Sequence, residues 1–86
     1  MKFKQEFVLR EIAGEYVLIP ISGLNQNFDG MIDLNETGAF IWRQIEAGKE
    51  KSEIVSAILG EYEVDRAQAE RNVNDFCDNL VKLGIL

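Results

Sequence analysis

The feature of this sequence that most restricts its fold is a change of apolar spacing at Asn35. Before Asn35, residues 28–34 carry an apolar residue or a glycine at every second position, which is the period of a β-strand. After it, apolar residues recur at the spacing of a helix, at Ile41, Trp42 and Ile45. Asn35 itself favours a helix start, because its side-chain oxygen can accept a hydrogen bond from a free backbone N–H of the first turn. The chain is therefore predicted to place its strands first and its helices second.

Three strands are predicted before Asn35. Two of them, Phe7–Ile12 and residues 15–21, are rich in apolar, β-branched and aromatic residues, and they flank Ala13-Gly14, which is typical of a turn. Pro20 has no N–H to donate, so it is expected at the end or the edge of its strand. The third strand is predicted over residues 28–34, after a polar loop at 22–27. Gly30 within that strand indicates a bulge or a close backbone approach.

Three helices are predicted after Asn35, over about residues 36–47, 52–62 and 65–84. Gly48 and Gly84 are natural ends for the first and third helices, because glycine readily adopts the left-handed conformation of a helix C-terminus. Asp65 and Gln68 form a capping-box-like pair at the start of the third helix. That helix carries one narrow apolar stripe, Ala69, Val73, Phe76, Leu80 and Leu83. The elements together predict a single α+β domain over residues 1–86, with strands at about 5–34 and helices at about 36–84.

The composition predicts a soluble protein that binds neither nucleic acid nor membranes. The chain is 47% hydrophobic and 28% charged, which is ordinary for a globular domain. Its net charge is −6 and its nine Lys and Arg residues are scattered, whereas phosphate-binding surfaces draw on clustered Lys and Arg. No signal peptide is recognisable, and no apolar run approaches the roughly 20 residues that span a bilayer. One cysteine cannot form an internal disulfide, so the reducing cytoplasm is the expected location.

The residues offer little for catalysis or for metal binding. The chain has no histidine, which is the commonest general base near neutral pH. Cys77 lies mid-helix between Phe76 and Asp78, and base rates for cysteine favour a small buried hydrophobic side chain over a nucleophile. Zinc sites use pairs of Cys or His, and Asp29 and Asp33 lack the spacing of a calcium loop. We therefore expect neither enzymatic activity nor a metal or cofactor.

A peptide-binding groove is a hypothesis that these residues do support. If the third strand lies at a sheet edge, its unpaired N–H and C=O groups can accept an extended peptide as a further strand. The third helix supplies a second wall, because Cys77 and Val81 widen its apolar arc on one side while polar residues border the other, namely Gln68, Asn72 and Asn79. Alternatively, Cys77 and Val81 pack on the first helix or on the sheet. The residues alone leave both interpretations open.

The chain also resembles a known family along nearly its whole length. The resemblance is carried by residues 34–42, then Gly48, Ile54, Leu59 and residues 62–65, then Val73, Phe76, Leu80 and the C-terminal Gly84-Ile85-Leu86. In this order they resemble the PqqD family of precursor-peptide recognition elements. The resemblance implies a winged-helix-like fold, in which a three-stranded antiparallel sheet is followed by three helices. It also implies a non-catalytic protein that holds the leader segment of a ribosomally made precursor peptide and presents it to a modifying enzyme. In the founding case that enzyme is a radical S-adenosylmethionine protein, so any cofactor would belong to the partner.

The resemblance implies that the leader pairs with the third strand and lies against the third helix. On the strand side, the expected contacts are Phe28, Asp29, Gly30, Met31, Ile32 and Asp33. On the helix side, they are Arg71, Asn72, Asp75, Cys77, Asn79 and Val81. The protein is expected to be a monomer, or a weak dimer formed through the same strand edge.

A winged-helix DNA-binding regulator is the alternative, because the implied topology is shared with that class. Its third helix would enter a major groove and would need Arg or Lys on its outer face. Arg66, Arg71 and Lys82 are present, but Asp75 and Asp78 lie on the same outer side. The peptide-binding hypothesis is therefore preferred.

Overall fold

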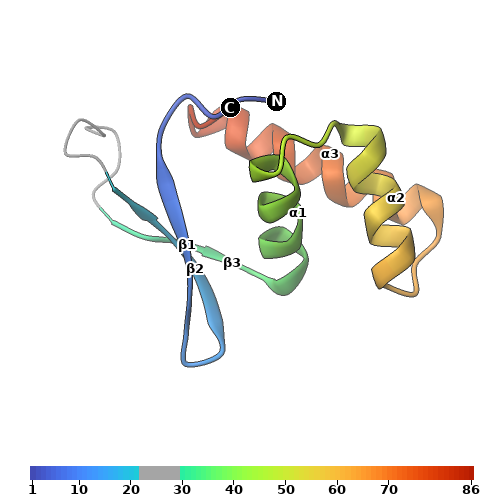
Figure 1. Ribbon diagram of the computed structural model, residues 1–86, viewed down its shortest axis with the longest axis horizontal. Coiled ribbons are helices and arrows are strands. Elements are labelled where there is room, and N and C mark those ends of the chain that lie inside the picture. The colour runs from blue at the N-terminus through green and yellow to red at the C-terminus, as the bar shows by residue number, and fades with distance from the viewer. Residues whose placement is uncertain (22–29) are drawn as a thin grey trace.

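The computed structural model describes residues 1–21 and 30–86 of the chain. It has the predicted α+β fold, in which a three-stranded antiparallel sheet of order β1-β2-β3 is followed by three helices. This arrangement is compatible with a winged-helix-like description. Figure 1 shows α1 between the sheet and α2, with α3 passing behind α1. Within the described residues, no helix is long and apolar enough to cross a membrane.

The first two strands form a tight hairpin. β1 is Phe7–Ile12 and β2 is Glu15–Pro20, with Ile12 opposite Glu15. The two residues between them have positive φ angles, 53° at Ala13 and 81° at Gly14, as a type I′ turn requires. Pro20 is the last residue of β2, as expected for a residue that has no N–H to donate within a strand. The predicted turn and the predicted place of Pro20 are both confirmed.

The third strand, β3, is shorter than predicted. It covers Ile32–Leu34 and pairs with β2 by placing Ile32 opposite Leu18 and Leu34 opposite Tyr16. Phe28 and Asp29, which were predicted to begin the strand, lie outside the described residues. Gly30 and Met31 precede β3, so Gly30 is not within the described strand, and among the described residues a Cβ added to Gly30 would meet nothing within 4 Å; neither the predicted bulge nor the predicted close approach is seen there. Within the part of the chain that the structure describes, β3 pairs with β2 alone and forms one edge of the sheet.

The change of period at Asn35 does mark the start of a helix. α1 covers Glu36–Glu46, and the Asn35 side-chain oxygen accepts a hydrogen bond from the Gly38 N–H at 2.7 Å. Gly48 follows the helix with a φ of 84°, as predicted for a residue that ends it. The strand and the helix are therefore joined without a loop, so the end of β3 and the first turn of α1 lie side by side.

The other two helices also begin at side-chain caps. α2 covers Lys51–Glu61 and starts with a capping box between Glu50 and Glu53, which the sequence analysis did not identify. α3 covers Arg66–Lys82, and the Asp65 carboxylate accepts a hydrogen bond from the Gln68 N–H at 2.8 Å. The Gln68 side chain bonds to Asn72 at 2.7 Å, so only the Asp65 half of the predicted capping box is formed.

The core is centred on Trp42 of α1, whose side chain is fully buried. The Phe3 ring stacks on it at 4.2 Å between centroids, and the Phe7 ring meets it edge-on at 6.3 Å. The sheet contributes Leu18, and the other helices contribute Ile54, Ile58, Val73 and Leu80. The Lys4 N–H donates to the Ile85 carbonyl at 2.6 Å, which brings the two ends of the chain together (Figure 1). α1 is thus held between the sheet and the other helices, and α3 is left with one side free to face β3.

Candidate functional site

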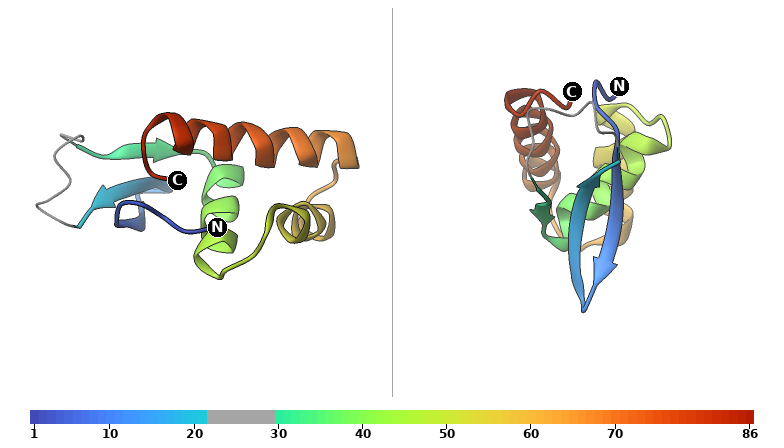
Figure 2. Two further views of the ribbon diagram at one scale, coloured as in Figure 1. Left: turned by 90° about the horizontal axis from the view of Figure 1, so that it is seen from above. Right: turned by 90° about the vertical axis from the view of Figure 1, so that its left-hand side faces the viewer.

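An apolar groove separates the edge strand from the last helix. β3 lies beside the C-terminal half of α3 in both views of Figure 2. The groove between them has a volume of about 380 Å³. Its lining is mostly apolar, with Ile32 and Leu34 from the strand and Phe76, Leu80 and Leu83 from the helix. Asp33, Asn79 and Lys82 complete the lining. An open strand edge therefore has apolar side chains immediately beside it.

A second groove adjoins the first, further along α3. It measures about 250 Å³ and lies between α3 and the first turn of α1. Its lining is more polar and consists of Asn35, Thr37, Gly38 and Ile41 with Asn72, Asp75, Phe76 and Asn79. Phe76 and Asn79 line both grooves, so the two adjoin each other, and we refer to them together as the depression along α3.

Gly38 determines how closely α3 approaches α1 at this depression. A Cβ on Gly38 would lie 3.2 Å from Cε1 of Phe76 and 3.1 Å from Oδ1 of Asn35. Both distances are shorter than an ordinary van der Waals contact, so the Phe76 ring packs where a side chain at Gly38 would be. The glycine thus places the one aromatic ring that the two grooves share.

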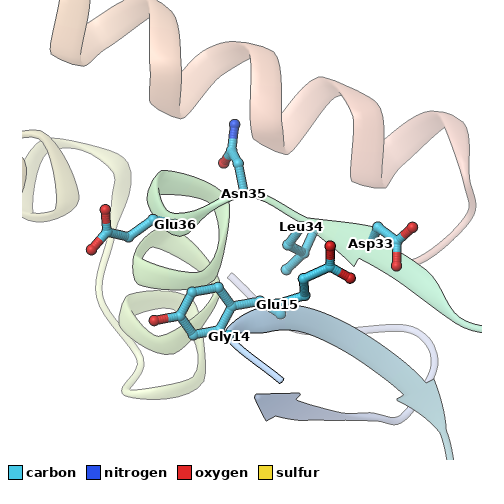
Figure 3. Close-up of a pocket in the computed structure, with 7 residues that line it drawn as sticks. Gly14, Glu15, Asp33, Leu34, Asn35 and Glu36 are labelled. Carbon is cyan, nitrogen blue, oxygen red and sulfur yellow. The ribbon is translucent and has the colours of Figure 1, made fainter. Parts of the chain in front are cut away.

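A third depression, of about 450 Å³, lies on the other side of the strand-to-helix junction. It is lined by the β1–β2 turn and the end of β3, and three of its residues are acidic, namely Glu15, Asp33 and Glu36. Figure 3 shows the Glu36 carboxylate at the opposite end from those of Glu15 and Asp33, and the Asn35 side chain directed toward α3. Among the described residues, no group of three or more carboxylates, His or Cys is arranged to hold a metal ion. This acidic depression therefore offers no metal centre.

Comparison with known proteins assigns the chain to a family. A family model described as coenzyme PQQ synthesis protein D (PqqD) matches residues 15–86. The chain belongs to the PqqD family. The solved structure "TbiB1 in Complex with the TbiA(beta) Leader Peptide" is 35% identical to it, with a TM-score of 0.76 over 99% of this chain and 94% of that one. No curated protein matches the sequence.

A second solved structure supports the fold of this PqqD-family chain. It is "Lasso peptide synthetase B1 complexed with the leader peptide", with 23% identity and a TM-score of 0.78 over 98% of this chain and 93% of that one. At this identity the likeness concerns the fold alone. The resemblance stated from the sequence is thus confirmed as family membership, and the predicted order of strands and helices is confirmed with it.

The structure sorts the predicted helix residues of this PqqD-family chain into two groups. Asn72, Asp75 and Asn79 line the grooves, whereas Arg71, Cys77 and Val81 line neither. The Arg71 guanidinium donates to Gln68 Oε1 at 2.9 Å. Val81 follows Leu80 in the helix, so its side chain is turned by about 100° away from the groove, and it is 58% exposed.

Cys77 belongs to the core. Its side chain is 2% exposed and its Sγ lies 3.9 Å from Sδ of Met1. Burial raises the pKa of the Cys77 thiol. The positive charge of Lys51 lowers this pKa, but by less than burial raises it. The interpretation of Cys77 as a packed side chain is therefore confirmed, and we remove it from the set of expected peptide contacts.

The strand side of the predicted site is only partly described. Ile32 and Asp33 line the apolar groove, and Gly30 and Met31 are exposed just before β3. Met31 is 62% exposed, which is unusual for so large an apolar side chain. Phe28 and Asp29 lie outside the described residues.

Part of the predicted apolar stripe of α3 faces the grooves. Leu80 is buried, whereas Phe76 is half-buried and Leu83, the C-cap residue of α3, is 41% exposed. The sequence contained a signal for this exposure, because Asn72 lies four residues before Phe76 and Asn79 lies four residues before Leu83. Residues four apart share a helix face, so this edge of the stripe is polar as well as apolar. Lys82 had been considered only as a DNA contact, and Gly38 only as part of the family resemblance over residues 34–42.

Proposed function

We propose that residues 1–86 act as one binding domain, which holds the leader segment of a ribosomally synthesised precursor peptide and presents it to a peptide-modifying enzyme. The observation that carries this proposal is the open edge of β3 with an apolar groove directly beside it. The comparisons support it, because the TbiB1 structure, at 35% identity, was solved in complex with a leader peptide. Membership of the PqqD family supports it independently.

The geometry suits an added strand. A peptide paired with β3 gains main-chain hydrogen bonds that do not depend on its sequence. Successive side chains of a strand point to opposite faces, so every second side chain of the peptide is directed toward α3. The groove lined by Leu80 and Leu83 accepts apolar side chains there. One strand and a few anchors correspond to an affinity in the micromolar to nanomolar range, roughly −8 to −12 kcal/mol.

The protein supplies binding, and the chemistry belongs to its partner enzyme. The chain has no histidine, and its one cysteine is buried with a raised pKa, so the described residues assemble no cysteine nucleophile paired with a histidine base. A radical S-adenosylmethionine enzyme is the partner class that the family resemblance implies. We place this pairing in the cytoplasm, where a reduced Cys77 is stable.

The described surface of α3 favours a peptide over duplex DNA. Asp75 and Asp78 lie on its exposed part, and Arg71 is engaged by Gln68. DNA-reading helices present unencumbered Arg and Lys to phosphates and base edges. We expect no electrophoretic shift of duplex DNA at near-physiological salt.

An NMR titration tests the proposal. The ¹⁵N-labelled protein would be titrated with the leader segment of a short precursor peptide, for which we expect a gene beside its own. We expect amide shifts at Ile32–Leu34 and along α3 from Phe76 to Leu83, where the groove lies. Exposed Ser56 and Gly60 of α2 should not shift and serve as the internal control. Unchanged amides in both β3 and α3 at saturating peptide would contradict the proposal.

A further inference from the structure

The depression along α3 has two chemically different ends. At one end, Leu80 and Leu83 face Ile32 and Leu34. At the other end, the lining consists largely of polar side chains, namely Asn35, Thr37, Asn72, Asp75 and Asn79. A ligand lying along the depression therefore has one end among apolar side chains and the other among polar side chains. The two ends of the ligand are thus distinguished by their polarity.

The polar end offers a negative charge with no partner. Within the residues that the structure describes, no hydrogen bond or ion pair engages the Asp75 carboxylate. Arg71, one turn earlier on α3, gives its guanidinium to Gln68 instead. No Lys or Arg lines this groove. A ligand group placed beside this exposed carboxylate would have to be a donor, because a carboxylate only accepts hydrogen bonds.

The start of α1 does not reverse this preference. A helix N-terminus carries partial positive charge and by itself favours an anion. Here, however, the Asn35 side chain already accepts the Gly38 N–H, and Glu36 places a carboxylate in the first turn. The helix end is therefore neutralised by its own residues, and Asp75 sets the sign of the local charge.

From this geometry we infer that the site prefers leaders that carry a lysine or arginine two to four residues from an apolar anchor. The inference rests on the proposed function. Asp75 precedes Leu80 and Leu83 on α3 by roughly 8 to 12 Å at 1.5 Å per residue. An extended peptide covers that distance in about two to four residues. The apolar side chain occupies the groove at Leu80 and Leu83, and the cation lies at Asp75.

The inference is tested with two fluorescein-labelled ten-residue peptides of one β-forming background. Both carry a leucine, and three residues away one carries lysine and the other glutamate; each is also made in the reversed order. Because Asp75 is exposed, its pairing with a cation is weak, and we expect the lysine peptide to bind roughly fivefold more tightly by fluorescence anisotropy. The preference should weaken as salt is raised.

Two charge reversals on α3 locate the preference. Asp75→Lys should invert it, so that the glutamate peptide binds more tightly. Asp78→Lys makes the same change of net charge one turn further along α3, at an exposed residue that lines neither groove, and should leave the preference in place. Circular dichroism establishes that both variants are folded.

Each alternative result has a defined meaning. Equal loss of preference in both variants would show that overall charge and not the polar groove selects the peptide, and it would overturn the inference. Equal affinity for the lysine and glutamate peptides, or no binding of either, would overturn it as well. The proposed function is judged separately by the leader titration, because loss of the β3 and α3 shifts there would refute leader binding itself.

Discussion

The two sides of α3 have different roles in the molecule. One side carries Ala69, Val73 and Cys77, which are buried in the core, while Leu80 is buried and also lines the apolar groove. The other side carries Asn72, Phe76, Asn79 and Leu83, which are partly exposed and line the grooves beside β3 and α1. The boundary falls between neighbours in the chain, since Cys77 is buried while Phe76 faces the groove.

Under the proposed function, α3 serves both as part of the scaffold and as one wall of the binding site. A helix turns by about 100° per residue, so two residues adjacent in sequence can serve separate surfaces. Changes on the buried side should act on the free energy of unfolding, and changes on the groove side should act on peptide affinity. Four substitutions test that separation, from the largest expected effect to the smallest.

Val73→Asp should give the largest effect. Val73 is 1% exposed, so the variant would bury a carboxylate without a partner and lose about 4 kcal/mol or more of unfolding free energy. Asn74→Asp is the control, because Asn74 is exposed and should change stability by about 0.5 kcal/mol or less. Urea denaturation followed by circular dichroism measures both. Similar midpoints for the two variants would contradict the assignment of this side to the core.

Cys77→Ser should lower stability and leave binding unchanged. A buried hydroxyl without a hydrogen-bond partner costs about 2 kcal/mol, and Cys77 touches no groove. In the wild type the raised pKa keeps a smaller fraction of the thiol ionised at any given pH than in the unfolded chain, so alkylation at pH 8 should be slow until urea is added. Mass spectrometry follows the alkylation. A weakened leader affinity in a folded Cys77→Ser protein would return Cys77 to the site.

Leu83→Asp should show the opposite behaviour. Leu83 is 41% exposed in the apolar groove, and a carboxylate there would face the apolar side chain of a bound leader. We expect about tenfold weaker binding, or 1.4 kcal/mol, with a smaller change in stability. Val81→Asp is the matched control, because Val81 lies on the same helix, is 58% exposed and lines neither groove. Isothermal titration calorimetry would refute the separation if both variants lost affinity equally.

Gly38→Ala should give the smallest effect, and whether it lowers or raises the free energy of unfolding tests the close approach of Phe76 to Gly38. Alanine is favoured over glycine in a helix by about 1 kcal/mol. At Gly38 the new Cβ meets Phe76 and the Asn35 oxygen that caps α1, so we expect a net loss of about 1 kcal/mol and a displaced Phe76 ring. Gly60→Ala in α2 meets nothing within 4 Å and should stabilise by about 1 kcal/mol. Thermal unfolding in which Gly38→Ala is as stabilising as Gly60→Ala would show that the close approach has no energetic consequence.

Much of the fold was predictable because its signals are local. The caps at Asn35 and Asp65 each join atoms three residues apart, and the two-residue turn at Ala13-Gly14 depends on the conformations of those residues alone. The site was less predictable. The alternation that extended the third strand back to residue 28 continues beyond the pairing with β2, which begins at Ile32. A pattern of apolar residues shows which face of a strand or helix is apolar, but it does not show which other element covers that face.

The sequence by itself determined the order of strands and helices, the caps at Asn35 and Asp65 and the apolar stripe of α3, because these follow from hydrogen bonds and periodicities within a few residues. Only the tertiary structure decided the rotation of α3, and with it the placing of Phe76 and Leu83 in the grooves and of Cys77 in the core. The physical reason is that the rotation depends on contacts between residues far apart in the chain. The ring of Phe76 fits against Gly38, and Cys77 packs against Met1.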